Sequence, residues 1–256
     1  MSDAPGAPAI RRMNISADLE RYTRWSREEQ AKAQSGLKDV LRSAAAATGL
    51  PIESWYLQPA GDAELAVLPP GIDEGEVIRE FPRALRRRLY EVNRGVSERV
   101  RLRMRVAMHV GITALGDMGF VGAAPIAVTR MRDSAPVREA MELNPDADFA
   151  LVISEVLHED HLGHLDHEYN MDTFRRIEID IPSKGYRGNA FLYVPPTRVV
   201  AGEPGDSPVG KEPEPPAFVV RHDALLHEGD NITLGPNSSF VRRDQYNGTR
   251  SRREKP

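Results

Sequence analysis

The spacing of apolar residues predicts a strand followed by a long helix near the start of the chain. Residues 11–19 form the first strand candidate. Ser26, with Glu29 three residues later, has the pattern of a helix-capping box, and apolar residues then recur at helical spacing as far as Ala47. Gly49 is expected to end this helix, since glycine readily adopts the backbone conformation found just after helix ends.

A hairpin and a second helix are predicted next. Residues 52–57 and 64–68 are strand candidates, and a tight corner at residues 59–62 joins them. From Glu74 onward the apolar side chains are separated by three or four residues, which places them on one face of a helix. These positions are Ile78, Phe81, Leu85, Leu89 and Val92.

The alternation of strands and helices then continues. Residues 102–111 alternate charged and apolar side chains, as in a half-buried strand, and a glycine-rich loop follows at residues 116–122. The remaining helix candidates are residues 123–131, residues 137–143 and a segment that begins at Ser154, and the remaining strand candidates are residues 150–153, 177–181 and 190–194.

The order strand, helix, hairpin, helix, strand is that of a split βαβ unit. The sequence therefore predicts an α+β fold: a ferredoxin-like βαββαβ sheet with helices on one face and added C-terminal strands. We expect this domain to span residues 11–196, after a flexible arm at residues 1–10. Residues 197–216 have the Pro, Gly and Glu content of a linker. Residues 217–256 form a mostly flexible tail with a short β-hairpin candidate, which either recruits a protein partner or is simply disordered.

Composition excludes several classes of function. The chain carries 34 basic and 38 acidic residues, a net charge of −4, which gives no general reason to expect binding to nucleic acid or to an anionic membrane. It has no cysteine, so disulfides and thiolate chemistry are excluded. No signal-peptide pattern or membrane-spanning apolar run is found, and we expect a cytoplasmic protein. The two common glycine-rich nucleotide-binding patterns, GxxxxGK[ST] and GxGxxG, are also missing from the sequence.

Four histidines at a three-residue interval form the most conspicuous pattern: His158, His161, His164 and His167. Each interval turns a helix by about 300°, so an unbroken helix cannot direct all four side chains at one ion. Two of them with a carboxylate could bind Zn or Ni, but a solvated surface feature is the favoured interpretation.

Two aspartates offer a different candidate metal site. Asp18 ends the first predicted strand, and Asp62 lies in the corner of the hairpin. These two places are neighbours in a ferredoxin-like sheet, and paired carboxylates suit Mg or Mn. By spacing alone, local hydrogen bonding within turns is the favoured explanation of the two residues.

Four segments in order resemble the successive motifs of class III nucleotidyl (adenylyl/guanylyl) cyclase catalytic domains. They are residues 15–24 (ISADLERYTR), 61–68 (GDAELAVL), 101–111 (RLRMRVAMHVG) and 122–131 (GAAPIAVTRM). The resemblance implies that Asp18 and Asp62 bind two Mg or Mn ions. It further implies that Arg130 stabilises the transition state and that Lys184 binds phosphate. The chain is identified on these motifs as a divergent bacterial member.

The remaining site positions implied by the resemblance contact the nucleotide: Leu19, Tyr22, Thr23 and Gln58. The sequence departs from the family pattern in several places. The asparagine expected four positions before Arg130 is Ile126, and the two base-selecting positions are Gln58 and Gly119. After the first metal ligand the family usually has a small residue, most often glycine. In this sequence that residue is Glu20, whose charge would repel a triphosphate.

The resemblance implies a homodimer that converts a nucleoside triphosphate to a 3′,5′-cyclic nucleotide and pyrophosphate. The aspartates would come from one subunit and the arginine from the other. The atypical base-selecting positions also fit bacterial defence cyclases that make pyrimidine cyclic nucleotides. The alternative is a catalytically degenerate domain that binds a nucleotide or recruits a protein.

Overall fold

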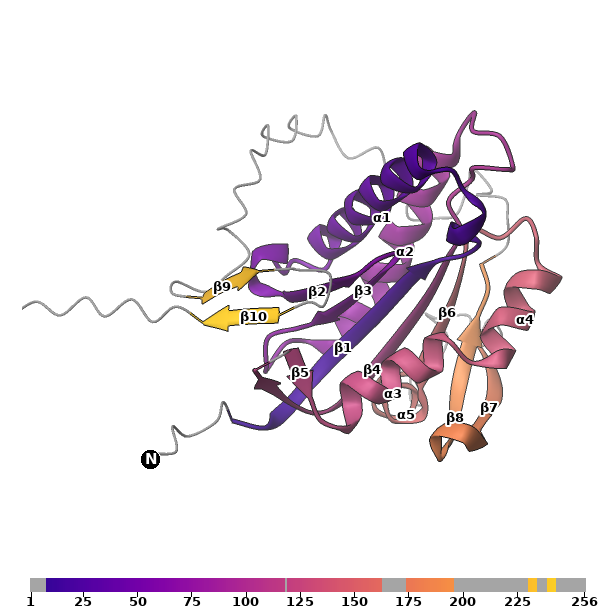
Figure 1. Cartoon of the computed structure of the whole chain (residues 1–256). Coiled ribbons are helices and arrows are strands. Elements are labelled where there is room, and N and C mark those ends of the chain that lie inside the picture. Colours follow the sequence, from indigo (N-terminus) through magenta and orange to yellow (C-terminus); the bar gives the residue numbers. More distant parts are fainter. Residues whose placement is uncertain (1–7, 118, 163–173, 196–229, 234–238, 243–256) are drawn as a thin grey trace, which may run out of the picture.

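The computed structural model describes residues 8–117, 119–162, 174–195, 230–233 and 239–242 (Figure 1). The predicted linker and most of the predicted arm and tail lie outside these residues. Within the tail, β9 (Asp230–Thr233) pairs with β10 (Ser239–Arg242) as a separate antiparallel two-stranded sheet.

The centre of the fold is an eight-stranded mixed sheet in the order β2-β3-β1-β4-β6-β8-β7, with β5 paired to β4. β1 is antiparallel to both β3 and β4, whereas β4 and β6 are parallel. The strands are β1 (Ile10–Leu19), β2 (Tyr56–Ala60), β3 (Ala63–Val67), β4 (Met104–Gly116), β5 (Gly119–Val121), β6 (Phe149–Ser154), β7 (Arg175–Ile181) and β8 (Tyr186–Tyr193). The ferredoxin-like core and the added C-terminal strands are therefore confirmed.

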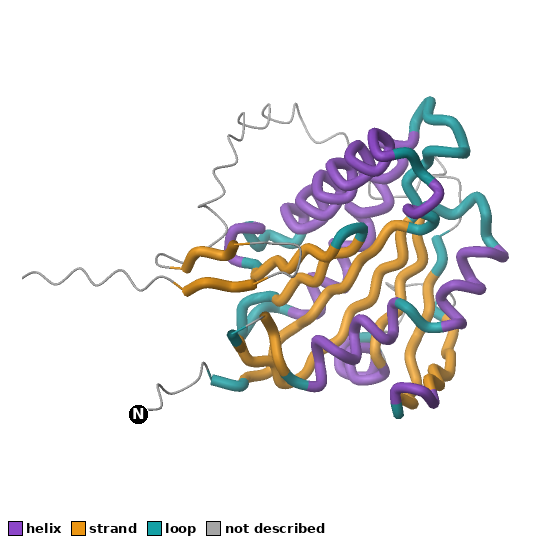
Figure 2. The backbone as a smooth tube through the Cα atoms, viewed as in Figure 1, coloured by secondary structure: helices purple, strands orange, loops and turns teal. Residues whose placement is uncertain are grey.

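Helices cover both faces of this sheet, which differs from the single helical layer that the sequence predicts (Figure 2). One core lies beneath α1 (Arg27–Ala47), α2 (Glu74–Asn93) and α5 (Glu155–His161). A smaller core lies beneath α3 (Ala123–Arg132) and α4 (Ala135–Leu143). Apolar residues in α3 and α4 contact Ala107, Ala150 and Val152 in the middle strands, so these small side chains leave room for a second layer. No helix in the described part of the chain is long and apolar enough to cross a membrane.

The first strand is buried on both faces, and this arrangement creates the candidate site. Met13, Ile15, Ala17 and Leu19 point into the core beneath α1 and α2. The intervening residues on the opposite face are polar and also buried: Asn14, Ser16 and Asp18. Because buried polar groups need partners, this face of β1 must be matched by polar groups from neighbouring elements.

Local signals near the helix ends agree with the structure. The capping box of Ser26 and Glu29 is formed at the start of α1, and Gly49 follows the helix with a φ of 70°. The strand predicted at residues 52–57 begins later: Ile52–Ser54 is a 3-10 turn and β2 starts at Tyr56. β2 contains Pro59, which is tolerated because β2 is an edge strand of the sheet.

Candidate active site

The structure brings the two aspartates to the same end of the sheet. In the β1–β3 pair, Asp18 lies opposite Ala63, and the backbone N–H of Leu19 donates to the carbonyl of Asp62 over 3.0 Å. Gly61, with a φ of 68°, lets the chain turn tightly just before Asp62. The predicted neighbourhood of the two aspartates is therefore realised in the backbone.

Two arginines surround the carboxylate of Asp18. Arg105 lies directly opposite it on β4, with Nε 3.0 Å from Oδ1 and Nη2 hydrogen-bonded to Oδ2. Nε of Arg132, at the end of α3, is 3.8 Å from Oδ2. Only 7% of the Asp18 side chain is exposed, so this cluster is almost closed to solvent. Both carboxylate oxygens are thus engaged by guanidinium groups.

The burial of Asp18 also changes its acidity. Removal from water raises the pKa of Asp18 from its usual 3.8 to about 6, while Arg105 and Arg132 oppose that change. The carboxyl consequently titrates close to the neutral range.

Arg132 ties α3 to the first strand. Its Nη1 donates to Oγ of Ser16 over 3.0 Å, and its Nε and Nη2 donate to the carboxylate of Asp133. The polar face of β1 is therefore satisfied by α3 and β4 together, and the end of α3 is fixed above Asp18.

Glu20 is paired rather than free to repel an anion. Its Oε2 lies 2.6 Å from Nη1 of Arg103, and Arg21 approaches its other oxygen at 3.4 Å. Arg103 is buried, and its remaining donors bind the backbone carbonyls of residues 141, 144 and 147. The backbone conformation that favours glycine is adopted by the next residue, Arg21, whose φ is 62°, and not by Glu20.

The predicted nucleotide contacts lie near the aspartates but differ in accessibility. The side chain of Leu19 is buried in the core, which leaves only its backbone for a ligand. Tyr22 accepts a hydrogen bond from Gln34 at its hydroxyl, and Gln34 also binds the carbonyl of Gly61, so the turn after β1 is joined to the hairpin corner. Thr23 is exposed, and Gln58 is partly exposed on β2.

Arg130 and Lys184 both lie near Tyr186. The guanidinium of Arg130 lies over the ring of Tyr186, 5.7 Å from its centroid. Lys184 is exposed in the 3-10 turn Pro182–Lys184, two residues before Tyr186. Ile126, on the same helix as Arg130, is 51% exposed. The described residues record no contact between this pair of cations and the pair of aspartates.

Of the four histidines, the two that the structure describes, His158 and His161, have different partners. The ring of His158 stacks on Phe191 at 3.5 Å, and burial lowers its pKa. His161 contacts Glu74 at 3.1 Å. His164 and His167 lie outside the described residues.

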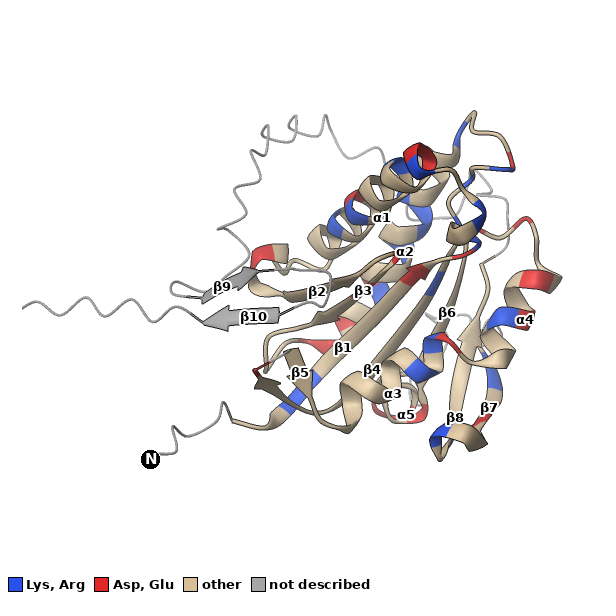
Figure 3. Cartoon of the chain, in the orientation of Figure 1, with Lys and Arg blue, Asp and Glu red and all other residues tan. Residues whose placement is uncertain are grey.

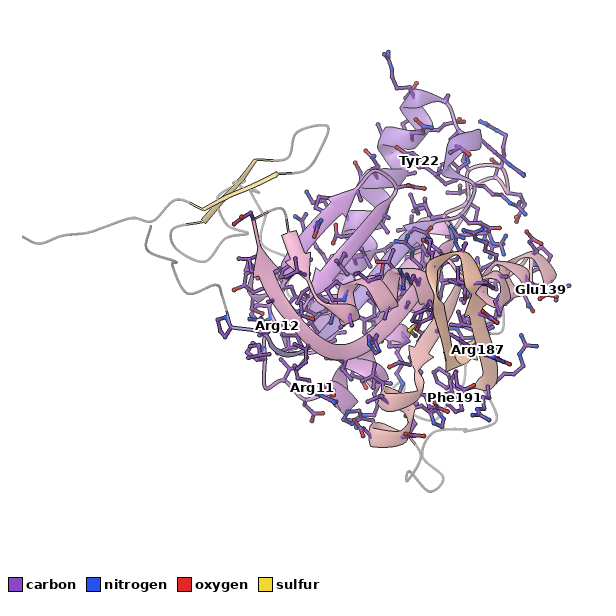
Figure 4. All side chains as sticks on the ribbon, turned by 60° about the horizontal axis from the view of Figure 1, so that its bottom comes forward. Arg11, Arg12, Tyr22, Glu139, Arg187 and Phe191 are labelled. Atoms are coloured by element: carbon purple, nitrogen blue, oxygen red, sulfur yellow. The ribbon has the colours of Figure 1, made fainter. Side chains whose placement is uncertain are left out.

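The oxygen and nitrogen atoms of Glu74, Asp160 and His161 lie within 4.8 Å of one another, which makes this the candidate cation cluster among the described residues. Arg11 already donates to both of its carboxylates. Arg11 is seven residues before Asp18 on β1, about 23 Å away in an extended strand. Figure 4 shows Arg11 and Tyr22 at opposite ends of the molecule. The cluster of Glu74, Asp160 and His161 is therefore separate from Asp18 and Asp62.

Asp18 and Asp62 differ in how well they could bind the two expected Mg or Mn ions. Their oxygens are the ligands that such ions prefer, and no side-chain partner of Asp62 is recorded in the described part of the chain. At Asp18, Arg105 already occupies both oxygens. Figure 3 shows where basic and acidic residues lie along β1, β4 and α3. The residues present fit an ion at Asp62, and they do not fit a second ion at Asp18.

Arg105 and Arg132 are the functional candidates that the sequence reading missed. The alternation in β4 placed Arg103 and Arg105 on its polar side, which a half-buried strand would turn to solvent. The available signal was register: once β1 and β4 are aligned antiparallel, Arg105 faces Asp18. Opposite charges directly across two strands are a favourable pair.

Comparison with known proteins rests on the fold. No protein-family model and no curated protein matches the sequence. Among solved structures, the guanylyl cyclase Cya2 is similar with a TM-score of 0.53 and 15% identity, over 74% of this chain and 93% of that chain. An adenylate/guanylate cyclase/hydrolase from Silicibacter pomeroyi is similar with a TM-score of 0.53 and 14% identity, over 74% of this chain and 99% of that one. The chain therefore has the fold of the class III adenylyl/guanylyl cyclase catalytic domains.

Proposed function

We propose that this protein is a nucleotidyl cyclase, which converts a nucleoside triphosphate to a 3′,5′-cyclic nucleotide and pyrophosphate. The observation that carries the proposal is the meeting of Asp18 and Asp62 at one end of a sheet with the cyclase fold. In the reaction the ribose 3′ oxygen attacks the α-phosphorus, a new P–O bond forms, and the bond to the β-phosphate oxygen breaks. The proton of the 3′ hydroxyl is released.

Asp62 is the residue best placed to hold a divalent ion. It is partly exposed in the turn beside the end of β1, and an Mg or Mn ion there would acidify the ribose hydroxyl and neutralise the triphosphate. The polar turn after β1, with Tyr22 and Thr23, would then face the nucleotide. The pairing of Glu20 with Arg103 reduces the repulsion that this carboxylate would exert on phosphate.

Arg130 and Lys184 would act from a second copy of the chain. Within one chain they lie beside Tyr186, apart from the aspartates. A homodimer in which each site combines Asp62 of one subunit with these cations of the other would place positive charge on the α-phosphoryl group. Charge fixed before the reaction stabilises the transition state without further reorganisation of the site.

A bacterial signalling or anti-phage defence role is proposed with the activity. The base is left open, because neither Gln58 nor Gly119 carries a charge that would select adenine or guanine. A second candidate function is a catalytically degenerate module that binds a nucleotide or recruits a protein. Ile126 favours it, since an exposed aliphatic side chain cannot orient the ribose by a hydrogen bond.

The two functions separate in one experiment. Purified protein is incubated with each of the four nucleoside triphosphates and Mn, and cyclic products are identified by mass spectrometry. We expect one or more products, reduced at least about 100-fold by Asp62→Ala, the range reported for loss of one strong electrostatic contact to a transition state. Asp160→Ala is the matched control, because this aspartate is paired with Arg11 at the other end of β1.

A product that survives Asp62→Ala would contradict the proposed site. Metal-dependent nucleotide binding with no cyclic product from any substrate would establish the degenerate module instead.

A further inference from the structure

The guanidinium of Arg105 occupies Asp18 in the way a bound cation would. Its Nε and Nη2 each contact one oxygen of the carboxylate, so the pair is bidentate. Such a fork-to-fork pair is among the stronger and more directional contacts that a carboxylate can form. An ion that approached Asp18 would have to compete with this arginine for the carboxylate.

Displacement is opposed by the surroundings of the pair. Arg105 and Asp18 face each other across adjacent strands, and 15% and 7% of their side chains are exposed. The opposite end of the cluster is closed by Arg132, which is itself held by Ser16 and Asp133. Arg105 is therefore held against Asp18, with only 15% of its side chain exposed.

The charge balance of the cluster gives the same result. Asp18 and Asp133 supply two negative charges, and Arg105 and Arg132 supply two positive charges, so the cluster is neutral as it stands. A divalent ion added at Asp18 would leave two uncompensated positive charges in a buried space, which is strongly unfavourable. Among the described residues no ion pair of Asp62 is recorded, and Asp62 lies in a more exposed turn than the Asp18 cluster.

We propose that each site binds one divalent ion, at Asp62, and that Arg105 is the built-in second cation of the site. This inference rests on the proposed function and specifies its metal requirement. Arg105 is a positioning residue: its fixed charge holds Asp18 and the end of β1 in place, and it cannot be removed by chelation. Asp18 then supports the site without being a metal ligand.

Native mass spectrometry of the protein with Mn and a 3′-deoxy nucleoside triphosphate, which cannot cyclise, counts the ions directly. We expect one Mn per chain in the wild type. Asp18→Asn changes the size of the side chain very little. It should leave one Mn bound, with a dissociation constant within about threefold of the wild-type value, where a tenfold change would correspond to about 1.4 kcal/mol. Asp62→Asn should abolish the bound ion.

Arg105→Gln tests the role of the arginine itself. With the guanidinium removed, Asp18 becomes free to bind, and a second Mn should appear in the complex. Arg88→Gln is the control, because Arg88 also donates two hydrogen bonds to an aspartate, Asp39, in a more exposed pair between α1 and α2, away from the site. Thermal unfolding of each variant verifies that it is folded. Should Arg105→Gln not fold, the Asp18→Asn count still decides the question.

Two Mn ions in the wild type, or the loss of one ion in Asp18→Asn, would overturn the inference while leaving the cyclase proposal intact. A folded Arg105→Gln that still binds a single ion would show that Arg105 is not what excludes the second. No Mn–nucleotide complex in the wild type would refute both the inference and the proposed function.

Discussion

At the scale of single residues, the backbone of Arg21 is held in a conformation that its side chain disfavours. Its φ of 62° makes it the one residue other than glycine with a positive φ in the described part of the chain. A left-handed conformation costs a residue with a Cβ atom about 1–2 kcal/mol. Strain of this kind persists only where neighbouring contacts impose it, and here it sits directly after the strand that carries Asp18.

Arg21→Gly should therefore stabilise the protein. We expect the free energy of unfolding to rise by about 0.5–1 kcal/mol, since relief of the backbone strain exceeds the entropy that glycine adds to the unfolded chain. Urea unfolding measures the change. Arg21→Ala is the control, because it removes the same charge yet keeps the Cβ atom, and it should give no stabilisation. If both substitutions stabilised the protein equally, the stabilisation would come from loss of the arginine charge and not from relief of backbone strain.

The acidity of Asp18 predicts a pH-dependent stability. Because burial raises its pKa from 3.8 to about 6, the folded protein binds a proton more tightly than the unfolded chain. This contribution to stability is fully present below about pH 4 and is lost as pH rises through 6, a loss of about 2–3 kcal/mol. Asp18→Asn cannot titrate. The wild type should lose stability relative to Asp18→Asn between pH 4 and 7 in urea titrations, and parallel profiles would contradict the raised pKa.

At the scale of elements, the junction between β5 and α3 depends on Gly122. Its φ is 125°, and a Cβ atom there would lie 2.5 Å from the carbonyl oxygen of Ile112 on β4. A side chain at this position must therefore push α3 away from the sheet, and α3 carries both Arg130 and Arg132. The position of these arginines over the sheet is set by a residue that touches neither.

Gly122→Ala should destabilise the protein by about 3 kcal/mol or more, combining backbone strain with a clash against the main chain. Gly95→Ala is the comparison, since Gly95 also has a positive φ of 76° but has open space around it. That substitution should cost only about 1 kcal/mol. Thermal and urea unfolding measure the loss of stability in both variants. Because only Gly122→Ala adds a clash to the backbone strain, similar losses in the two variants would contradict the packing argument for Gly122.

The strand and helix order could be read from the sequence because its signals are local. The capping box of Ser26 and the periodicity of α2 each involve residues within a few positions of one another. The second helical layer could not be foreseen, because it depends on the small side chains of Ala107 and Ala150 meeting α3 and α4 across the sheet. The pairing of Asp18 with Arg105 spans 87 positions and requires the strand register. The alternation of polar and apolar residues predicts which side chains share a face of a strand. It does not predict which residues of other elements they contact.

At the scale of the whole molecule, the candidate catalytic residues are divided between two regions. Asp18 and Asp62 lie at the end of β1 beside β3, and Arg130 and Lys184 lie beside Tyr186 at β8. A single chain thus presents two separate half-sites, one with the aspartates and one with Arg130 and Lys184. Two copies arranged about a twofold axis would join each half-site to its complement and form two complete sites, since such an interface is self-complementary.

This division predicts complementation between inactive variants. Asp62→Ala and Arg130→Ala should each lower cyclase activity at least about 100-fold when assayed alone. In an equimolar mixture that has exchanged subunits, half of the dimers pair one variant with the other, and each mixed dimer has one intact site. The mixture should therefore regain about a quarter of the wild-type activity, as follows from random pairing in a closed dimer. A mixture no more active than its parts would place both residues in the same chain's site and rule out the shared-site dimer.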